Sequence, residues 1–391
     1  MLNRRLVVAL LLTGSVLPAS SMTAAAQEKL RIGIISDFTG PFANVGIRLR
    51  YGIETFFGEH GPKVGGREVE LIYRDVGNGS AAAAKQIAEE LVVRDKVSMI
   101  GGFSVTPEVS AAASVVTEGK IPTVIMVPST PALVKMSPYF VRTGNNMIAT
   151  VWSGADWAYN IAGRRRAYIV VADFAPGYEV QNTFKKRFTE LGGTIVGEDR
   201  APLSTVDYAP FAERIVRANV DVVQMFVPTG TPSISFVRAL AAQGVFSKGL
   251  AVIGVGETDD ADLPSFDDSV LGVHTSFYYA STLENPENTA FRQKLAAKFK
   301  DAVLAPYPVT GYDSMQVLYK MAESQAGKPF DGDSAVKSIL GYKWNSPRGP
   351  ASIDPESHDI VENYYIRRVE KVNGELRNVV VKTYEQQPPR F

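Results

Sequence analysis

Residues 30–59 read LRIGIISDFTGPFANVGIRLRYGIETFFGE. The mostly apolar run at 30–35 is typical of a buried β-strand, and Ala43 to Glu59 has the apolar spacing of an amphipathic helix. The pair recurs at once, because Glu68 to Tyr73 predicts the next strand and Ser80 to Val93 the next helix, N-capped by its first serine. Short strands that alternate with helices predict βαβ units and therefore a parallel sheet.

The same alternation continues through two further pairs and then restarts after Gly144. In the first part we expect strands at 97–100 and 121–127, with helices that begin near Thr106 and Thr130. In the second part we expect strands at 167–172, 194–197, 220–227 and 250–255, with helices from about Glu179, Ala209, Thr231 and Asp259. Two successive open α/β units fit this pattern better than a single (β/α)₈ barrel, which stays open as an alternative.

The pattern changes after Gly272. Two long amphipathic helices are expected at 285–303 and 309–325. Asn373-Gly374 then separates the β-rich runs 364–372 and 379–383. Because an Asn-Gly pair between two strands is a strong hairpin signal, we expect a β-hairpin there.

The composition is that of an ordinary globular chain. The 391 residues are 45% hydrophobic, and 41 basic residues balance 41 acidic ones. A net charge of zero argues against nucleic-acid binding, which needs an excess of Lys and Arg. Because cysteine is absent and only three histidines occur, we expect no disulfide, no metal site and no cofactor.

Residues 1–26 predict a cleaved secretory signal peptide. A basic segment, Asn3-Arg4-Arg5, precedes the apolar run 6–12, and Ala24-Ala25-Ala26 offers an A-x-A cleavage pattern. The apolar run is much shorter than the about 20 residues that a bilayer span needs, and no cysteine could carry a lipid. We therefore expect a periplasmic protein without a membrane anchor.

The sequence lacks the motifs of common enzyme classes. It has no G-x-S-x-G elbow, no P-loop and no complete dinucleotide motif after the first strand. The run 254–257, Gly-Val-Gly-Glu, begins like a dinucleotide turn but is better explained as a tight turn between a strand and a helix. Asp259-Asp260 and Asp267-Asp268 are more typical of helix N-termini than of metal sites. We therefore expect a binding protein, not an enzyme, with no catalytic residue.

Small hydroxyl residues follow two of the predicted strands. Ser104 and Thr106 come after the third strand, and Ser129 and Thr130 come after the fourth. In open α/β sheets ligands bind beyond the carboxyl ends of the strands, where helix N-termini offer N–H groups to anions. Hydroxyl and N–H donors together suit a carboxylate without an arginine. The alternative is that these side chains only cap helices.

Four short motifs follow one another along the chain: 39–43 (TGPFA), 100–104 (IGGFS), 121–123 (IPT) leading to 128–131 (PSTP), and 312–313 (YD). In this order and spacing, over essentially the whole mature chain, they resemble the type I periplasmic solute-binding proteins of ABC importers. The most similar group is the leucine/isoleucine/valine-binding branch.

This resemblance implies the fold and the partners. The fold would be α/β, with two open parallel-sheet lobes joined by a three-crossing hinge that closes on a ligand. Behind the signal peptide, lobe 1 would comprise 27–143 plus 276–362, and lobe 2 would comprise 144–275 plus 363–391. The partners would be a small carboxylate ligand and the membrane permease subunits of an ABC importer, and we expect a monomer that binds no nucleic acid.

The resemblance also implies which residues contact the ligand. Ser104, Ser129 and Thr130 match the positions that bind the ligand's α-carboxylate. Glu257 is the nearest candidate for the acid that takes an ammonium group, and Tyr307 matches an aromatic residue that covers the apolar end. With three aromatic residues of the same loops, the candidate ligand-binding residues are Ser104, Ser129, Thr130, Phe103, Tyr307, Glu257, Phe42 and Phe174.

The sequence departs from the family pattern where ligand-facing aromatic residues are expected. Val45, Pro176 and Thr229 stand at or near such positions. A roomier pocket follows, which puts leucine itself in doubt and favours a bulkier ligand. We expect a small carboxylate, with a hydrophobic amino acid as the leading ligand. An aromatic or other organic acid without an amine stays an alternative, as does a role as the ligand-sensing partner of a membrane receptor.

Overall fold

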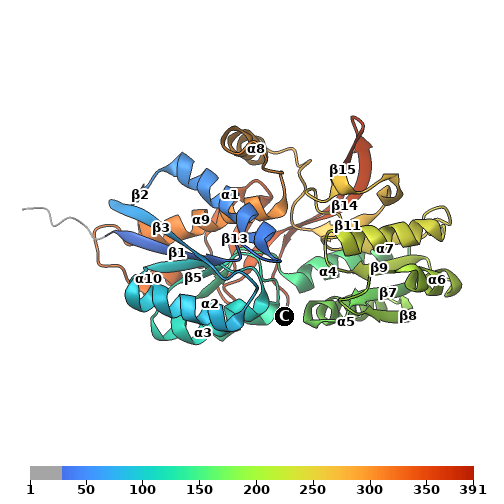
Figure 1. The fold of residues 1–391 in the computed structure, drawn as a ribbon, viewed down its shortest axis with the longest axis horizontal. Coiled ribbons are helices and arrows are strands. Elements are labelled where there is room, and N and C mark those ends of the chain that lie inside the picture. Colours follow the sequence, from blue (N-terminus) through green and yellow to red (C-terminus); the bar gives the residue numbers. More distant parts are fainter. Residues whose placement is uncertain (1–28) are drawn as a thin grey trace, which may run out of the picture.

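The computed structural model describes residues 29–391, so the predicted signal peptide at 1–26 lies outside the described residues. Two halves lie side by side, and each is built around its own sheet (Figure 1). The strands of the first half are β1 (Leu30–Ser36), β2 (Lys63–Val64), β3 (Arg67–Asp75), β4 (Met99–Gly102), β5 (Thr123–Ile125) and β6 (Phe140–Arg142). Their order is β2-β3-β1-β4-β5-β6, and every neighbouring pair except β2–β3 is parallel.

Helices cover both faces of this first sheet, as the predicted βαβ pattern requires. They are α1 (Ala43–His60), α2 (Ala81–Glu89), α3 (Thr106–Glu118), α9 (Pro306–Ser324) and α10 (Gly332–Lys337). Successive strand side chains point to opposite faces. Ile34 therefore joins the core formed with α1 and α9, whereas Ile35 joins the core formed with α2 and α3.

Two glycines allow α1 and α9 to pack closely. A Cβ atom at Gly52 of α1 would lie 1.8 Å from the carbonyl oxygen of Pro308. A Cβ atom at Gly311 of α9 would lie 2.3 Å from the carbonyl oxygen of Leu49. Since real Cβ atoms do not approach backbone so closely, only glycine fits at either position without moving the helices apart.

The second half is built on β7 (Arg166–Ala172), β8 (Thr194–Ala201), β9 (Val222–Phe226), β10 (Ala251–Gly254) and β11 (His274–Phe277). These five strands are parallel, in the order β11-β10-β9-β7-β8. The helices of this half are α4 (Met147–Asp156), α5 (Ala175–Glu190), α6 (Ala209–Arg217) and α7 (Thr231–Ala242). A further helix, α8 (Pro286–Lys298), contacts α1 of the first half, where Lys294 forms an ion pair with Glu59. Two π-helical turns, Glu90–Arg94 and Trp157–Ile161, extend α2 and α4.

One long strand links the two halves. The remaining strands are β12 (Lys343–Ser346), β13 (Gly349–Ile353), β14 (Ile360–Val372) and β15 (Glu375–Gln387). The start of β14 pairs with β13, and its middle pairs antiparallel with β11. Its end forms the predicted hairpin with β15, because Asn373 and Gly374 both adopt the positive φ that a tight two-residue turn needs.

The predicted fold class is confirmed, and two open sheets exclude the barrel alternative. Two helix predictions are corrected. The segment after Thr130 forms only a 3₁₀ helix, Pro131–Met136, and the segment after Asp259 forms two 3₁₀ turns, Leu263–Ser265 and Asp268–Val270. The segments are short. They contain proline or follow aspartate, and both residue types favour turns over long helices.

Candidate ligand-binding site

A cavity of about 570 Å³ lies between the two halves. Its lining comes from the loops after β4 and β5 on one side and from the loops after β7, β9 and β10 on the other. Ligands of open α/β sheets bind at this edge, beyond the carboxyl ends of the strands. Six aromatic side chains line the cavity: Phe42, Phe174, Phe226, Phe277, Tyr278 and Tyr307.

Ser104 lines the cavity after β4 and is held through both its backbone and its side chain. Its N–H donates to Oε2 of Glu108 at 2.7 Å. Its hydroxyl oxygen accepts from the N–H of Asp37 at 2.9 Å and lies 2.8 Å from the hydroxyl oxygen of Ser36. The N-cap of α3 is Val105, so Ser104 is not a cap. When Ser36 donates to it, Ser104 can direct its own hydroxyl hydrogen into the cavity.

Ser129 and Thr130 line the same side of the cavity after β5. The Thr130 hydroxyl has only long contacts, 3.3 Å to the hydroxyl of Thr106 and 3.4 Å to Oε2 of Glu179. It caps no helix. Arg142 fixes the loop by donating from Nη1 to the Thr130 carbonyl oxygen at 2.7 Å. The capping alternative is therefore wrong for Thr130, and its hydroxyl is available to a ligand.

Glu257 lines the cavity on the opposite side, but the chain itself uses its carboxylate. Oε1 accepts from the N–H of Val227 at 3.2 Å, and Oε2 accepts from the N–H of Val255 at 2.5 Å. The residue is 1% exposed. Burial raises the pKa of Glu257 to about 7, although these N–H groups favour the charged form. Its carboxylate thus serves first to hold the ends of β9 and β10.

The predicted aromatic residues, with one exception, line the cavity from both halves. Phe42 and Tyr307 belong to the first half, and Phe174 belongs to the second. The ring of Phe174 stacks on Phe226, with 5.9 Å between centroids and an interplanar angle of 9°. Burial raises the pKa of Tyr307 to about 12, so its phenol stays neutral. These rings form an apolar body for the cavity.

Phe103 is the exception, and we correct its prediction. Its side chain is fully buried and belongs to the core that contains Ile35 and Val109. It does not line the cavity. Positive φ angles at Gly102 (119°) and Phe103 (69°) turn the chain between β4 and α3, and the Phe103 ring packs inside that turn. Phe103 is therefore part of the core, although it directly precedes Ser104, which lines the cavity.

Sequence reasoning did not identify Tyr278, which lines the cavity and connects it to the linkage between the halves. The Tyr278 hydroxyl lies 3.0 Å from the hydroxyl oxygen of Thr310. Its ring lies 5.2 Å from the guanidinium carbon of Arg348. The only sequence signal is the aromatic run 277–279, which begins at the last residue of β11, a short strand that was not predicted.

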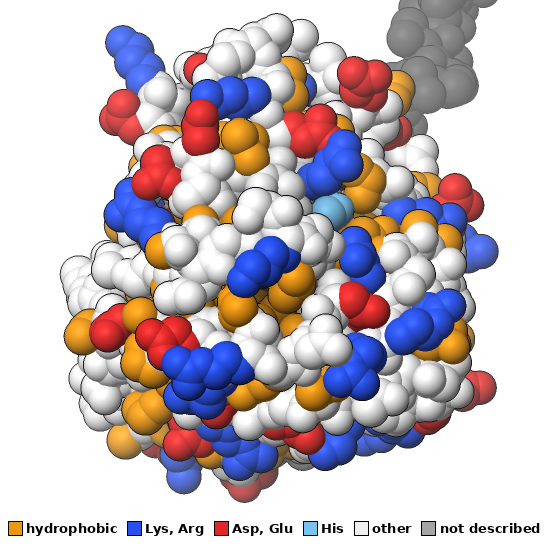
Figure 2. Space-filling view, turned by 90° about the vertical axis from the view of Figure 1, so that its right-hand side faces the viewer, with side chains coloured by type: hydrophobic (Ala, Val, Ile, Leu, Met, Phe, Trp, Pro, Cys, Tyr) orange, Lys and Arg blue, Asp and Glu red, His pale blue; other side chains and the backbone are white. Residues whose placement is uncertain are grey.

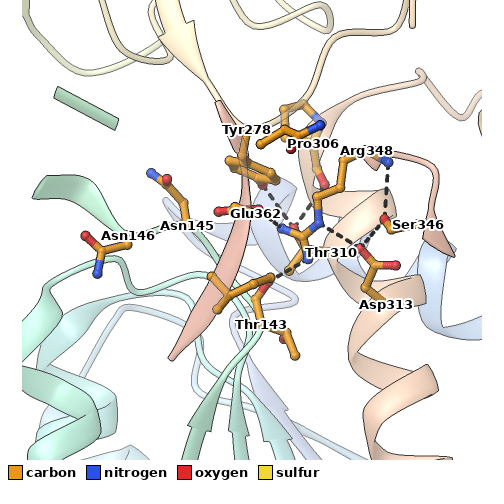
Figure 3. A network of polar contacts seen from close by, with 12 residues as sticks. Thr143, Asn145, Asn146, Tyr278, Pro306, Thr310, Asp313, Ser346, Arg348 and Glu362 are labelled. Carbon is orange, nitrogen blue, oxygen red and sulfur yellow. Dashed lines mark hydrogen bonds and ion pairs between the residues drawn. The ribbon is translucent and has the colours of Figure 1, made fainter. Parts of the chain in front are cut away.

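Arg348 joins three segments that are far apart in the sequence in a buried network (Figure 3). It forms ion pairs with Asp313 at 2.8 Å and with Glu362 at 2.7 Å. It also donates from Nη2 to the carbonyl oxygen of Thr143 at 2.7 Å. Thr143 and Glu362 lie where the chain passes between the halves, so this network fixes the linkage behind the cavity.

Within residues 29–391, no group of three or more His, Cys, Asp and Glu side chains is arranged to hold a metal ion. On the face drawn in Figure 2, Lys and Arg side chains are interspersed with Asp and Glu side chains. None of the helices in this described part of the chain is both long and apolar enough for a membrane span.

The described residues match a family of known proteins almost from end to end. Residues 29–375 match the family described as periplasmic binding protein. The chain belongs to the periplasmic binding proteins. Its type I fold and its likeness to the leucine/isoleucine/valine-binding branch are thereby confirmed.

Relatives of this periplasmic binding protein differ in the ligands that their names state. A Brucella melitensis protein named Leu/Ile/Val-binding protein homolog 6 is 37% identical over 371 residues, covering 93% of this chain and 94% of the relative. A Rhodopseudomonas palustris solute-binding protein in complex with 3,4-dihydroxybenzoic acid is 36% identical, with a TM-score of 0.85 and coverage of 92% and 98%. A second protein from that species, in complex with p-hydroxybenzoic acid, is 36% identical, with a TM-score of 0.87 and coverage of 93% and 98%.

Proposed function

We propose that this periplasmic binding protein takes up an aromatic carboxylate without an α-amino group and delivers it to the permease subunits of an ABC importer. The observation that carries the proposal is the polarity of the cavity. Hydroxyl groups lie on one side, aromatic rings form the body, and the lining carboxylate of Glu257 is already engaged by backbone N–H groups.

The engagement of Glu257 argues against an amino-acid ligand. An ammonium group buried in the cavity needs a charged or strongly accepting partner, because an unpaired buried charge is costly. Each oxygen of Glu257 already accepts one hydrogen bond, which leaves fewer of its acceptor sites for an ammonium, and its pKa of about 7 makes it partly neutral at neutral pH. An acid that lacks the amine needs no such partner.

The carboxylate of the ligand would bind the hydroxyl groups of Ser104, Ser129 and Thr130. Hydrogen bonds from neutral donors to a charged acceptor contribute about 1.5–3 kcal/mol each. The ring of the ligand would pack among the aromatic side chains, with Tyr307 and Phe42 on one side and Phe174 on the other. The known ligands of the two Rhodopseudomonas palustris proteins, both hydroxylated benzoic acids, support this class.

A hydrophobic amino acid is the second candidate. The name of the Brucella melitensis relative favours it, and Glu257 does border the cavity. The lobes would close on either ligand, with lobe 1 at 27–143 plus 276–362 and lobe 2 at 144–275 plus 363–391, after export to the periplasm by the signal peptide.

Ligand carried through purification tests the proposal. The protein is purified from its native host, denatured and analysed for released small molecules by mass spectrometry. An aromatic acid without nitrogen is the expected result. Release of leucine, isoleucine, valine or phenylalanine instead would contradict the aromatic-acid proposal and favour the second candidate.

A further inference from the structure

Two buried acidic residues lie directly behind Ser104. Asp37 follows β1, Glu108 lies in the first turn of α3, and both side chains are 0% exposed. Oδ1 of Asp37 accepts from the N–H of Gly79 at 2.8 Å, and Oε2 of Glu108 accepts from the N–H of Ser104 at 2.7 Å. The other oxygen of each acid, Oδ2 of Asp37 and Oε1 of Glu108, has no hydrogen-bond partner among the described residues.

A proton shared between the two acids would give both of these oxygen atoms a hydrogen-bond partner. Two adjacent buried carboxyl groups cannot both ionise at low cost, and a neutral carboxylic acid can donate to a carboxylate. Burial first, and then the contact with Asp37, raises the pKa of Glu108 to about 8. Asp37 is the charged group that faces Glu108, and the other groups against it are the N–H groups of Ser104 and Val105.

We propose that Asp37 and Glu108 share one proton, and that this acid pair positions the Ser104 hydroxyl for the ligand's carboxylate. Glu108 holds the backbone of Ser104, and the N–H of Asp37 donates to the Ser104 hydroxyl oxygen at 2.9 Å. The bond between the two acids ties the loop after β1 to the start of α3. The positioning role rests on the proposed function, whereas the shared proton does not.

The shared proton also controls the charge behind the site. With it, the pair carries one negative charge, and without it the pair carries two. A second negative charge beside a site for an anion repels the ligand and separates the two acids. Affinity for a carboxylate should therefore fall as the pH rises above about 8, the pKa of Glu108.

Calorimetry at two pH values tests the positioning role. The probe is benzoate or hydrocinnamate, whichever binds the wild type more tightly, because both stay ionised across the range. We expect an affinity about tenfold lower at about pH 9.5 than at about pH 6.5. Glu108→Gln keeps a donor between the two side chains and leaves one charge at both pH values. Its affinity should therefore be the same at both pH values.

Two further variants complete the comparison. Glu108→Ala should bind more weakly than Glu108→Gln at both pH values, because it loses the contacts to Asp37 and Ser104. Glu118→Gln is an exposed change on the same helix, and its affinity should fall with rising pH as that of the wild type does. A wild type whose affinity is the same at both pH values, or a fall in affinity that persists in Glu108→Gln, would overturn the positioning role.

Unfolding of the ligand-free protein tests the shared proton separately. Because the folded-state pKa of Glu108 is raised from 4.5 to about 8, its contribution to stability is complete below about pH 4.5 and is lost as the pH rises to about 8. The free energy of unfolding of the wild type should fall relative to that of Glu108→Gln over this range. A difference that is constant with pH would overturn the shared proton even if ligands bind. If the free energy of unfolding falls as expected but the protein binds no carboxylate, the proposed function and the positioning role are both overturned.

Discussion

Thr130 lines the cavity, and its hydroxyl group has no short hydrogen bond to any other residue of 29–391. Its contacts at 3.3 and 3.4 Å are longer than the usual 2.5–3.0 Å of hydroxyl hydrogen bonds. Thr130→Val should therefore weaken carboxylate binding roughly tenfold to a hundredfold, with little change in the free energy of unfolding. Calorimetry and denaturant unfolding measure the two effects. Thr194→Val, an exposed change on β8, is the control. Affinity within twofold of the wild type in Thr130→Val would remove Thr130 from the site.

Glu257 should make the stability of the protein depend on pH. Burial raises its pKa from 4.5 to about 7, so its stabilising contribution is lost as the pH rises between these values. Relative to Glu257→Gln, the wild type should lose roughly 3 kcal/mol of unfolding free energy over that range. Denaturant unfolding at several pH values measures this difference, with the exposed Glu284→Gln as control. A constant difference would mean that Glu257 is ionised throughout.

At this scale the sequence predicts where a residue lies better than what it contacts. Ser104, Thr130 and Glu257 line the cavity because they follow strands whose carboxyl ends meet at one edge. The engagement of Glu257 by Val227 and Val255 depends on a neighbouring strand 30 residues away, which no local pattern encodes. Phe103 was misplaced for a similar reason, since only its positive φ sends the ring into the core.

Helices α1 and α9 of the first half pack closely against each other where they cross. Gly52→Ala would place a Cβ atom 1.8 Å from the Pro308 carbonyl oxygen, so it should cost about 1–3 kcal/mol of stability or more. Gly58→Ala is a matched control on the same helix, because its Cβ would meet only the flexible end of Lys298 at 3.3 Å. That change should be neutral or stabilising by up to about 1 kcal/mol. Equal stabilities for the two variants would contradict the close packing.

Periodicity predicted the elements of the central sheets, because buried parallel strands and amphipathic helices have distinct repeats. It did not predict β11, β12 and β13, which are four or five residues long and depend on pairing with distant segments such as β14. The buried network around Arg348 was missed for the same reason. Its partners Thr143 and Glu362 are far apart in the sequence and meet only in the folded chain.

The linkage between the halves predicts a change in shape on binding. If the lobes close as we propose, ligand should stabilise the closed state by binding it more tightly. Small-angle scattering should then give a smaller radius of gyration at ligand saturation than without ligand. An unchanged radius, in a sample whose binding is proven by calorimetry, would count against closure.

The central claim is that the cavity selects a carboxylate that lacks an amine. Calorimetry with hydrocinnamate and phenylalanine tests it most directly, because the two compounds share the ring, the chain and the carboxylate and differ only in the amine. Leucine and benzoate extend the comparison to a smaller apolar group and a shorter acid. We predict that hydrocinnamate or benzoate binds at least tenfold more tightly than either amino acid, since an unpaired buried ammonium is costly. Tighter binding of phenylalanine or leucine than of both aromatic acids would contradict the account.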